Sequence, residues 1–337
     1  MIRVLILTIL INEILGNAVS FNQPKFCPTV KWNSKGELFT ATETSRSLPL
    51  ILFIDTNNTI YVNSGKEDVI SVWYKDHSHP KSISYLSKVE ISSIFVIDNG
   101  DIYIAYLNNT ISKWIASTDS FVHVMNGESI CADLFIDVNN NLYCSMAWED
   151  VVIKRSLYKD KETDIVIVAG TGSGGSAAYQ LSSPIGIFVD TNLDLYVADR
   201  HNDRIQLFHS GERNATTVAG QGSLDFTISL LKPWSIVLDH EKYLFILDYG
   251  NGRIVRSGPH GFQCLLGCIA KEIKEYRLYD PSRLSFDVNG NLFVCDANGR
   301  RIQRFTLQKD SCEKSEYRIS ARKRCIVSDF CGDMLIP

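Results

Sequence analysis

The 337-residue chain carries 34 lysines and arginines against 38 aspartates and glutamates, a formal net charge of −4 at pH 7, and 45% of its residues are hydrophobic. This balance excludes an intrinsically disordered chain, and the near-neutral charge gives no global attraction to nucleic acid or to an anionic membrane. The length exceeds one ordinary compact core and suits either two domains or a repeat architecture.

Residues 1–20 have the pattern of a secretory signal peptide. Arg3 is a short positive region, residues 4–15 are mostly apolar, and the small residues Gly16, Ala18 and Ser20 follow, so that cleavage after Ala18 or Ser20 is expected. The alternative is a buried N-terminal strand or helix. No other stretch reaches the roughly 18 apolar residues that a membrane-spanning helix needs. We therefore expect a secreted protein without a membrane span, and a monomer.

One pattern occurs six times: an apolar strand ending in aspartate, a turn of Asn, Gly or Asp residues, and a second strand of the form Leu/Ile-Tyr/Phe-Val. The copies cover residues 52–62, 95–104, 134–144, 187–197, 236–246 and 284–294, with marker aspartates Asp55, Asp98, Asp137, Asp190, Asp239 and Asp287. Repeats of roughly 40–50 residues with several short strands are typical of propeller blades. We predict an all-β protein over residues 21–311, a six-bladed β-propeller of four-stranded antiparallel blades. A pair of β-sandwiches would not explain six copies of one unit.

The fourth copy, residues 184–208 with the lead-in 168–175, resembles the NHL repeat, and residues 296–305 of the sixth copy are similar to it. Copies one to three depart from the repeat, with Asn63, Tyr106 and Met146 where it has aspartate after the second strand. The resemblance implies a propeller that binds proteins, RNA or other ligands. A minority of relatives with similar propellers are lyases or lactonases.

Polar residues that recur among the copies of the repeat have structural interpretations. An aspartate before a hairpin turn accepts backbone N–H bonds and fixes the turn, so we expect this role for the six marker residues rather than a ring of catalytic carboxylates. Arg204, Arg253 and Arg301 begin third strands and are expected to pair with aspartates or carbonyl groups of their own blade.

The sixth copy lacks a fourth strand, and we predict that residues 28–32 near the N-terminus supply it. This closure would bring Cys27 beside Cys312. Local pairs are predicted for Cys131 with Cys144 and for Cys264 with Cys268, although sequence alone leaves the connectivity open. Cys325 and Cys331 form a further candidate pair in the basic tail, residues 312–337. Cys295 remains, and we expect a buried thiol.

Three Asn-x-Ser/Thr sequons agree with export, and they begin at Asn57, Asn108 and Asn214. Asn57 and Asn108 fall in predicted turns. We expect glycosylation at these three positions if the chain is secreted.

Motifs for chemistry are sparse. Residues 170–175 match G-x-G-x-x-G, but the segment leads toward another strand rather than a long helix, so a loop between blades is the better interpretation. His77 and His79 have chelating spacing in a polar stretch that reads as an exposed loop. We therefore expect no cofactor and no metal. The alternative is a metal-dependent propeller enzyme of the lyase or lactonase type.

The loops between second and third strands converge at one end of the predicted ring, where propellers commonly bind ligands. The residues expected there differ from blade to blade and include the aromatic and basic types that are enriched in interfaces: Lys66, Tyr106, Trp148, Arg200, His201, Tyr249 and Arg300. We predict a binding scaffold for an unidentified protein or small ligand. The alternative is a set of solvated loops without a partner.

Overall fold

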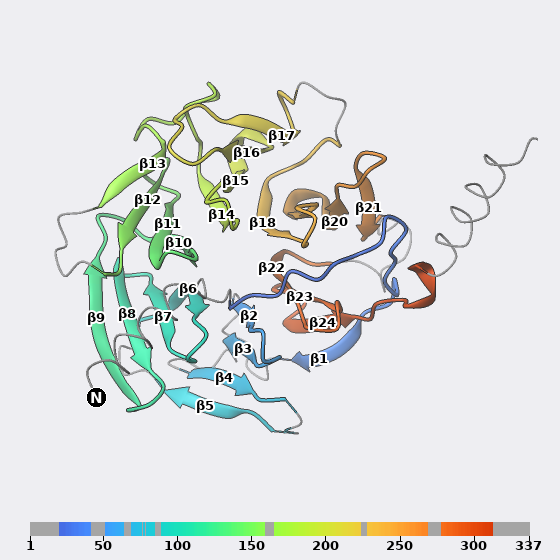
Figure 1. The fold of residues 1–337 in the computed structure, drawn as a ribbon, viewed down its shortest axis with the longest axis horizontal. Helices are drawn as coiled ribbons and strands as arrows, with labels where there is room; N and C mark the ends of the chain where they lie inside the picture. Colours follow the sequence, from blue (N-terminus) through green and yellow to red (C-terminus); the bar gives the residue numbers. More distant parts are fainter. Residues whose placement is uncertain are drawn as a thin grey trace, which may run out of the picture.

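The computed structural model describes residues 20–41, 51–63, 69–75, 77, 79–84, 89–158, 165–223, 228–268 and 278–312. Within these residues the chain forms six four-stranded antiparallel sheets, which follow one another around a ring (Figure 1). The predicted six-bladed β-propeller is confirmed. Residues 1–19, with the expected signal region, and residues 313–337, with Cys325 and Cys331, lie outside the described residues. No described helix is long and apolar enough to cross a membrane.

Every blade has an inner, a second, a third and an outer strand. The inner strands are β2 (Leu52–Ile54), β6 (Ile91–Val96), β10 (Cys131–Ile136), β14 (Pro184–Val189), β18 (Pro233–Leu238) and β22 (Pro281–Phe286). The second strands are β3 (Ile60–Asn63), β7 (Ile102–Tyr106), β11 (Asn141–Met146), β15 (Leu195–Asp199), β19 (Leu244–Asp248) and β23 (Leu292–Asp296). The third strands are β4 (Val69–Trp73), β8 (Thr110–Ile115), β12 (Val151–Ser156), β16 (Arg204–Phe208), β20 (Arg253–Arg256) and β24 (Arg301–Phe305). The outer strands are β5 (Lys81–Ser84), β9 (Ser120–Asn126), β13 (Val166–Gly170), β17 (Thr216–Gly220), β21 (Gln263–Leu266) and β1 (Glu37–Ala41).

The hydrophobic core lies between the blades. All residues of β14 and of the second strands β7, β15, β19 and β23 are buried, because each of these strands is covered on both faces by neighbouring blades. Outer strands are more exposed, and five of the seven residues of β9 are open to solvent. Each inner strand packs against the next, and contact between β2 and β22 closes the ring.

Aspartate fixes the hairpin turn between the first two strands in five blades. In each, one carboxylate oxygen accepts the backbone N–H groups two and four residues further on, as for Asp287 with Asn289 at 2.9 Å and Asn291 at 2.8 Å. The other four are Asp55, Asp137, Asp190 and Asp239. The predicted role is confirmed for these five residues.

The second blade differs from the prediction. Strand pairing places Val96 opposite Ile102, as it places Ile54 opposite Ile60, so Ile97 rather than Asp98 occupies the marker position. The Asp98 side chain is exposed. The turn is instead held through Asn99, whose side-chain oxygen accepts the Asp101 N–H at 3.0 Å.

The two ends of the chain share the sixth blade, as expected, but not through the predicted residues. The outer strand is β1, which pairs with β24, whereas residues 28–32 run beside the segment that follows β24. Trp32 forms an isolated bridge with Leu307, and the N–H of Asn33 donates to the Thr306 carbonyl at 2.9 Å. Because β24 ends at Phe305, residues 28–32 lie beyond the end of the sheet, and the strand that joins the sheet starts only at Glu37.

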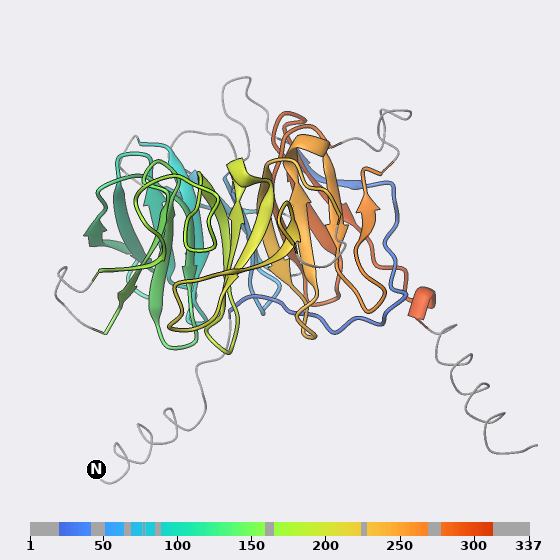
Figure 2. The ribbon, with the colours of Figure 1, turned by 90° about the horizontal axis from the view of Figure 1, so that it is seen from above.

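Residues 20–33, which we call the N-terminal strap, extend along the end of the ring that carries the turns between inner and second strands (Figure 2). The Phe21 ring packs against phenylalanines of three inner strands, with centroids 6.3 Å from Phe95, 5.2 Å from Phe135 and 5.0 Å from Phe188. The side-chain amide of Asn22 donates to the Asp55 carbonyl at 2.9 Å and to the carbonyl of a residue in β22. The strap therefore covers the axis of the propeller at this end.

Three disulfides are present, and they join Cys27 to Cys312, Cys131 to Cys144 and Cys264 to Cys268. The first connects residues 285 apart in the sequence, beside the strap. Cys295 is fully buried as a thiol, and burial raises its pKa to about 12. These are the three pairs and the buried thiol that the sequence analysis expects.

Candidate functional site

We call the end of the ring opposite the strap the loop face, because it carries the loops between second and third strands. Trp148 lies there between β11 and β12, and 79% of its side chain is exposed. His201 and Arg300 are also exposed, whereas Arg200 and Tyr249 are half-buried in the short helices η2 (Arg200–Asn202) and η3 (Tyr249–Asn251). Lys66 lies outside the described residues.

Tyr106 does not belong to the exposed set. It is the last residue of β7, and only 4% of it is exposed. It stands at the strand position that Asp199, Asp248 and Asp296 occupy in later blades, and these three residues are buried as well. The prediction that Tyr106 is displayed on the loop face is therefore wrong.

Ion pairs fix the loops of blades four to six. Arg204 Nε lies 2.7 Å from Asp199 Oδ2, and the pairs Arg253–Asp248 at 2.7 Å and Arg301–Asp296 at 2.9 Å repeat this geometry. The second oxygen of Asp199 accepts the backbone N–H of Ser182 at 2.7 Å, which ties the loop to the start of β14. The expectation that these arginines act within their own blades is confirmed, because each is paired with an aspartate of the same blade.

Arg200 belongs to an aromatic stack that the sequence analysis missed. Its guanidinium carbon lies 4.8 Å from the centre of the Trp234 ring, and the Trp234 and Tyr249 rings lie 4.9 Å apart, tilted by 33°. Trp234 comes from the start of β18, whereas Arg200 comes from the loop of the preceding blade. The sequence signal that could have identified Trp234 is its position directly after Pro233, at the start of an inner strand. We call Arg200, Trp234 and Tyr249 the rim stack.

Asp280 lies beside the Tyr249 end of the rim stack. Burial, together with the charge of Asp280 and a hydrogen bond to it, raises the pKa of Tyr249. The Asn298 side-chain amide also donates to Asp280 at 3.1 Å. The acidic group is therefore engaged at one end of the stack, and the cationic group lies at the other.

The channel along the axis holds a second feature that was not predicted. Arg283 on β22 and Asp133 on β10 approach to 3.1 Å between a guanidinium nitrogen and a carboxylate oxygen. Asp133 also accepts the Ser93 hydroxyl at 2.9 Å and the backbone N–H of Ile187 at 3.0 Å. The inner strands therefore bring a charged pair together. No sequence signal relates Asp133 to Arg283, because about 150 residues separate them.

The described residues contain no group of three or more His, Cys, Asp or Glu side chains that could hold a metal ion. His77 and His79 are exposed, as expected for a surface loop. Residues 171–183 connect β13 to β14 by turns, so within this stretch the G-x-G-x-x-G segment precedes no helix. Gly170 adopts φ +82°, and a β-carbon there would lie 2.1 Å from the Asp150 carbonyl, which explains the glycine by close backbone packing.

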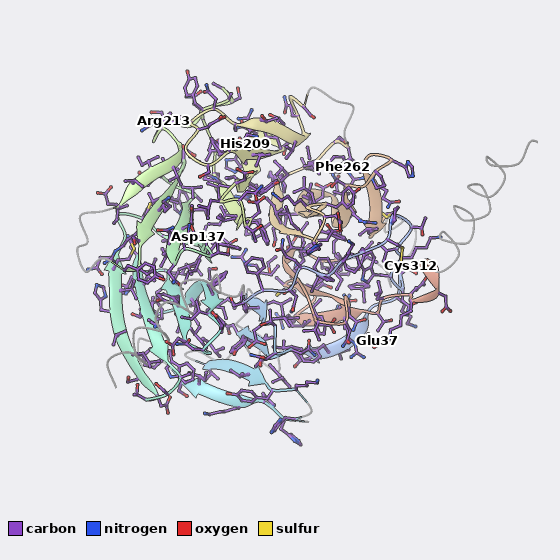
Figure 3. All side chains as sticks on the ribbon, in the orientation of Figure 1. Glu37, Asp137, His209, Arg213, Phe262 and Cys312 are labelled. Carbon is purple, nitrogen blue, oxygen red and sulfur yellow. A yellow bond between two sulfur atoms is a disulfide. The ribbon has the colours of Figure 1, made fainter. Side chains whose placement is uncertain are left out.

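Grooves lie on the outer surface of the ring. One of about 410 Å³ separates the strap from the β20–β21 hairpin, and it is lined by residues 28–32 and 258–265. Phe262 lies on that hairpin, whereas His209 and Arg213 mark the corresponding hairpin of the fourth blade, which lines smaller grooves (Figure 3). The three sequon residues Asn57, Asn108 and Asn214 are all exposed.

No protein-family model and no curated protein sequence matches the chain. Several solved structures share its fold. A streptogramin B lyase is 14% identical, with 87% of this chain and 95% of that chain covered and a TM-score of 0.56. A catalytically inactive virginiamycin B lyase from Staphylococcus aureus with quinupristin is 12% identical, with 82% and 100% covered and a TM-score of 0.59. An auxiliary nutrient binding protein from Bacteroides ovatus is 12% identical, with 86% and 76% covered and a TM-score of 0.59.

These similarities establish one thing about the chain. It has the β-propeller fold. Proteins with lyase names and a protein with a binding name share that fold, so it is compatible with either a scaffold or an enzyme.

Proposed function

We propose that this protein is a secreted NHL-type propeller that binds a protein or another ligand through its loop face. The observation that carries the proposal is Trp148, a large aromatic side chain that is 79% exposed on that face. Tryptophan is among the residues most enriched at binding hot spots, because its burial removes a large apolar area from water. The apolar surface of Trp148 is removed from water only when a partner covers it.

Neighbouring features support the same face. Tyr179 is half-exposed in the loop between β13 and β14. This loop lies at the same end of the ring as Trp148, because the Ser183 N–H donates to the Asp150 carboxylate at 2.7 Å. The strap covers the axis at the opposite end through Phe21 and Asn22. The strap therefore leaves the loop face as the end at which we place the ligand.

Secretion and the NHL assignment rest on separate features. Three disulfides suit an oxidising compartment. The Asp–Arg pairs of blades four to six involve the residues on which the resemblance to NHL repeats depends. Asn57, Asn108 and Asn214 are exposed, as glycosylation in the secretory pathway would require.

A metal-dependent propeller enzyme is the second candidate, because two of the similar structures are lyases. Such an enzyme needs several convergent metal ligands, and the described residues offer no group of three. We therefore favour binding. Elemental analysis of the purified secreted protein separates the two candidates: a stoichiometric transition metal that a chelator removes without unfolding would support the enzyme.

The proposal is tested by capture of a partner with matched variants. Trp148→Ala on the loop face should reduce capture of the partner that the wild-type protein retains, by about thirtyfold in affinity for a hot-spot aromatic residue. Tyr158→Ala is the control, because Tyr158 is equally exposed but follows β12, at the strap end. Equal capture by both variants would contradict the assignment of the loop face.

A further inference from the structure

Arg200 differs from the other arginines of its blade in its partners. The nearest aspartate in the sequence, Asp199, is already engaged by Arg204, by Asn202 and by a backbone N–H. Among the described residues Arg200 forms no ion pair with a carboxylate, and its closest polar neighbour is the His201 ring at 3.5 Å. Its Nε atom is buried and has no acceptor in the described part of the chain. Arg200 thus brings to the loop face a positive charge that contacts the Trp234 ring but pairs with no carboxylate among the described residues.

The rim stack fixes the orientation of this charge. A guanidinium group that stacks on an aromatic ring keeps its N–H donors in a plane parallel to the ring, directed outward from its edge. Trp234 supplies that ring, and Tyr249 packs on Trp234 and is held in turn by Asp280. The conformational freedom of the arginine is therefore restricted before any ligand binds, which lowers the entropic cost of recognition.

The charge of the site selects the ligand. Exposed Lys232 precedes Trp234 by two residues, and exposed His201 follows Arg200. The carboxylates of Asp199 and Asp203 in the same loop already accept N–H groups of Arg204 and Lys232. A single oriented arginine matches one planar carboxylate, which it can hold through two parallel N–H···O bonds. Phosphate groups and nucleic acids are recognised by clusters of basic residues rather than by a single arginine.

We propose that Arg200, stacked on Trp234, is a subsite for the carboxylate of an acidic peptide segment in the partner protein. This inference rests on the proposed function of the loop face and specifies the chemistry of its ligand. Trp148 would contact apolar surface of the same partner, while Arg200 would bind its carboxylate.

The test uses the full secreted chain with 15N-labelled arginine. The side-chain Nε resonance of Arg200, assigned by its loss in Arg200→Lys, is followed during titration with acetyl-Glu-Glu-amide, acetyl-Gln-Gln-amide or inorganic phosphate. We expect a saturable shift with the glutamate peptide, and binding weaker by about tenfold for the glutamine peptide, because a charge-assisted hydrogen bond is replaced by a neutral one. The resonance of Arg204, which is already paired, should stay in place.

Variants separate charge from geometry. Arg200→Lys keeps the charge but lacks the planar fork, and we expect glutamate-peptide affinity, followed by peptide resonances, to fall about tenfold. Arg213→Gln is the matched control, because Arg213 is an exposed arginine of the same blade at the strap end, and affinity should not change. An unchanged thermal midpoint verifies folding of each variant.

Three results would overturn the subsite: no saturable shift of Arg200, equal binding of the glutamate and glutamine peptides, or tighter binding of phosphate than of the glutamate peptide. If Trp148→Ala abolishes partner capture in the same preparation while Arg200 fails to respond, the loop face still binds and only the subsite is refuted. If Arg200 responds as expected but no partner depends on Trp148, the subsite is supported and the wider proposal fails.

Discussion

Arg283 and Asp133 form an ion pair across the axis of the propeller, with 3.1 Å between guanidinium nitrogen and carboxylate oxygen. They lie on β22 and β10, the inner strands of the sixth and third blades, which face each other across the ring (Figure 1). Arg283 also donates to the Ala132 carbonyl at 3.0 Å. Both side chains are largely buried, so the pair joins opposite halves of the ring where water contributes little screening.

Removal of one partner should therefore leave an uncompensated charge in the channel. We predict that Arg283→Met and Asp133→Asn each lower the free energy of unfolding by about 3 kcal/mol. The double variant should lose less than the sum, with a coupling of about 2 kcal/mol, as measured by denaturant titration of all four proteins. Additive losses would show that the two groups do not interact.

The turn aspartates offer a test of register in the second blade. Asp287→Ala removes the acceptor of two backbone N–H groups and should lower the free energy of unfolding by about 2 kcal/mol. Asp98→Ala is the matched control and should leave stability unchanged, because Ile97 occupies the marker position and the Asp98 side chain is exposed. Similar destabilisation by both substitutions, measured by denaturant titration, would mean that the register is wrong.

The disulfides should contribute according to the loops that they close. The bond between Cys27 and Cys312 spans 285 residues, and its replacement by two serines should cost about 5 kcal/mol through loop-closure entropy. The bond between Cys264 and Cys268 spans four residues and should contribute about 2 kcal/mol. Thermal unfolding of the two double-serine variants measures the difference, and equal losses would contradict a role of the long bond in closing the ring.

Cys295 should be unreactive in the folded protein. Its pKa is raised to about 12, chiefly by burial, so that the group remains a protonated thiol at pH 8, below both this value and the ordinary value of an exposed cysteine. Iodoacetamide at pH 8 should therefore modify Cys295 only after denaturation, which peptide mass spectrometry can follow. Rapid modification in the native state would show that β23 opens to solvent.

Most of the fold follows from local sequence. The repeated strand–turn–strand unit predicts the blades because its alternation and turn residues act within about ten residues. The second blade was misaligned because Ile97 and Asp98 are adjacent, and only strand pairing shows which of them stands at the end of β6. Likewise, residues 28–32 resemble a strand, but the Cys27 bond and the end of β24 determine where the outer strand begins.

The site was less predictable, because its parts come from different blades. Trp148 was identified as a loop residue from its own blade alone, and its exposure agrees with that prediction. The stack of Arg200 on Trp234, in contrast, depends on how the fourth and fifth blades pack, and no local pattern contains both residues. The prediction for Tyr106 is wrong because β7 extends to this residue, so that its side chain is buried in the blade rather than displayed on the loop.

The most direct test of the central claim is hydrogen–deuterium exchange of the full chain with and without the captured partner. Binding at the loop face should slow exchange in residues 146–150, 199–203 and 248–252, which form loops between second and third strands. Exchange in the opposite turns, residues 55–59, 137–141 and 287–291, should be unaffected. Protection of those turns, with no change at Trp148 and Arg200, would contradict the account.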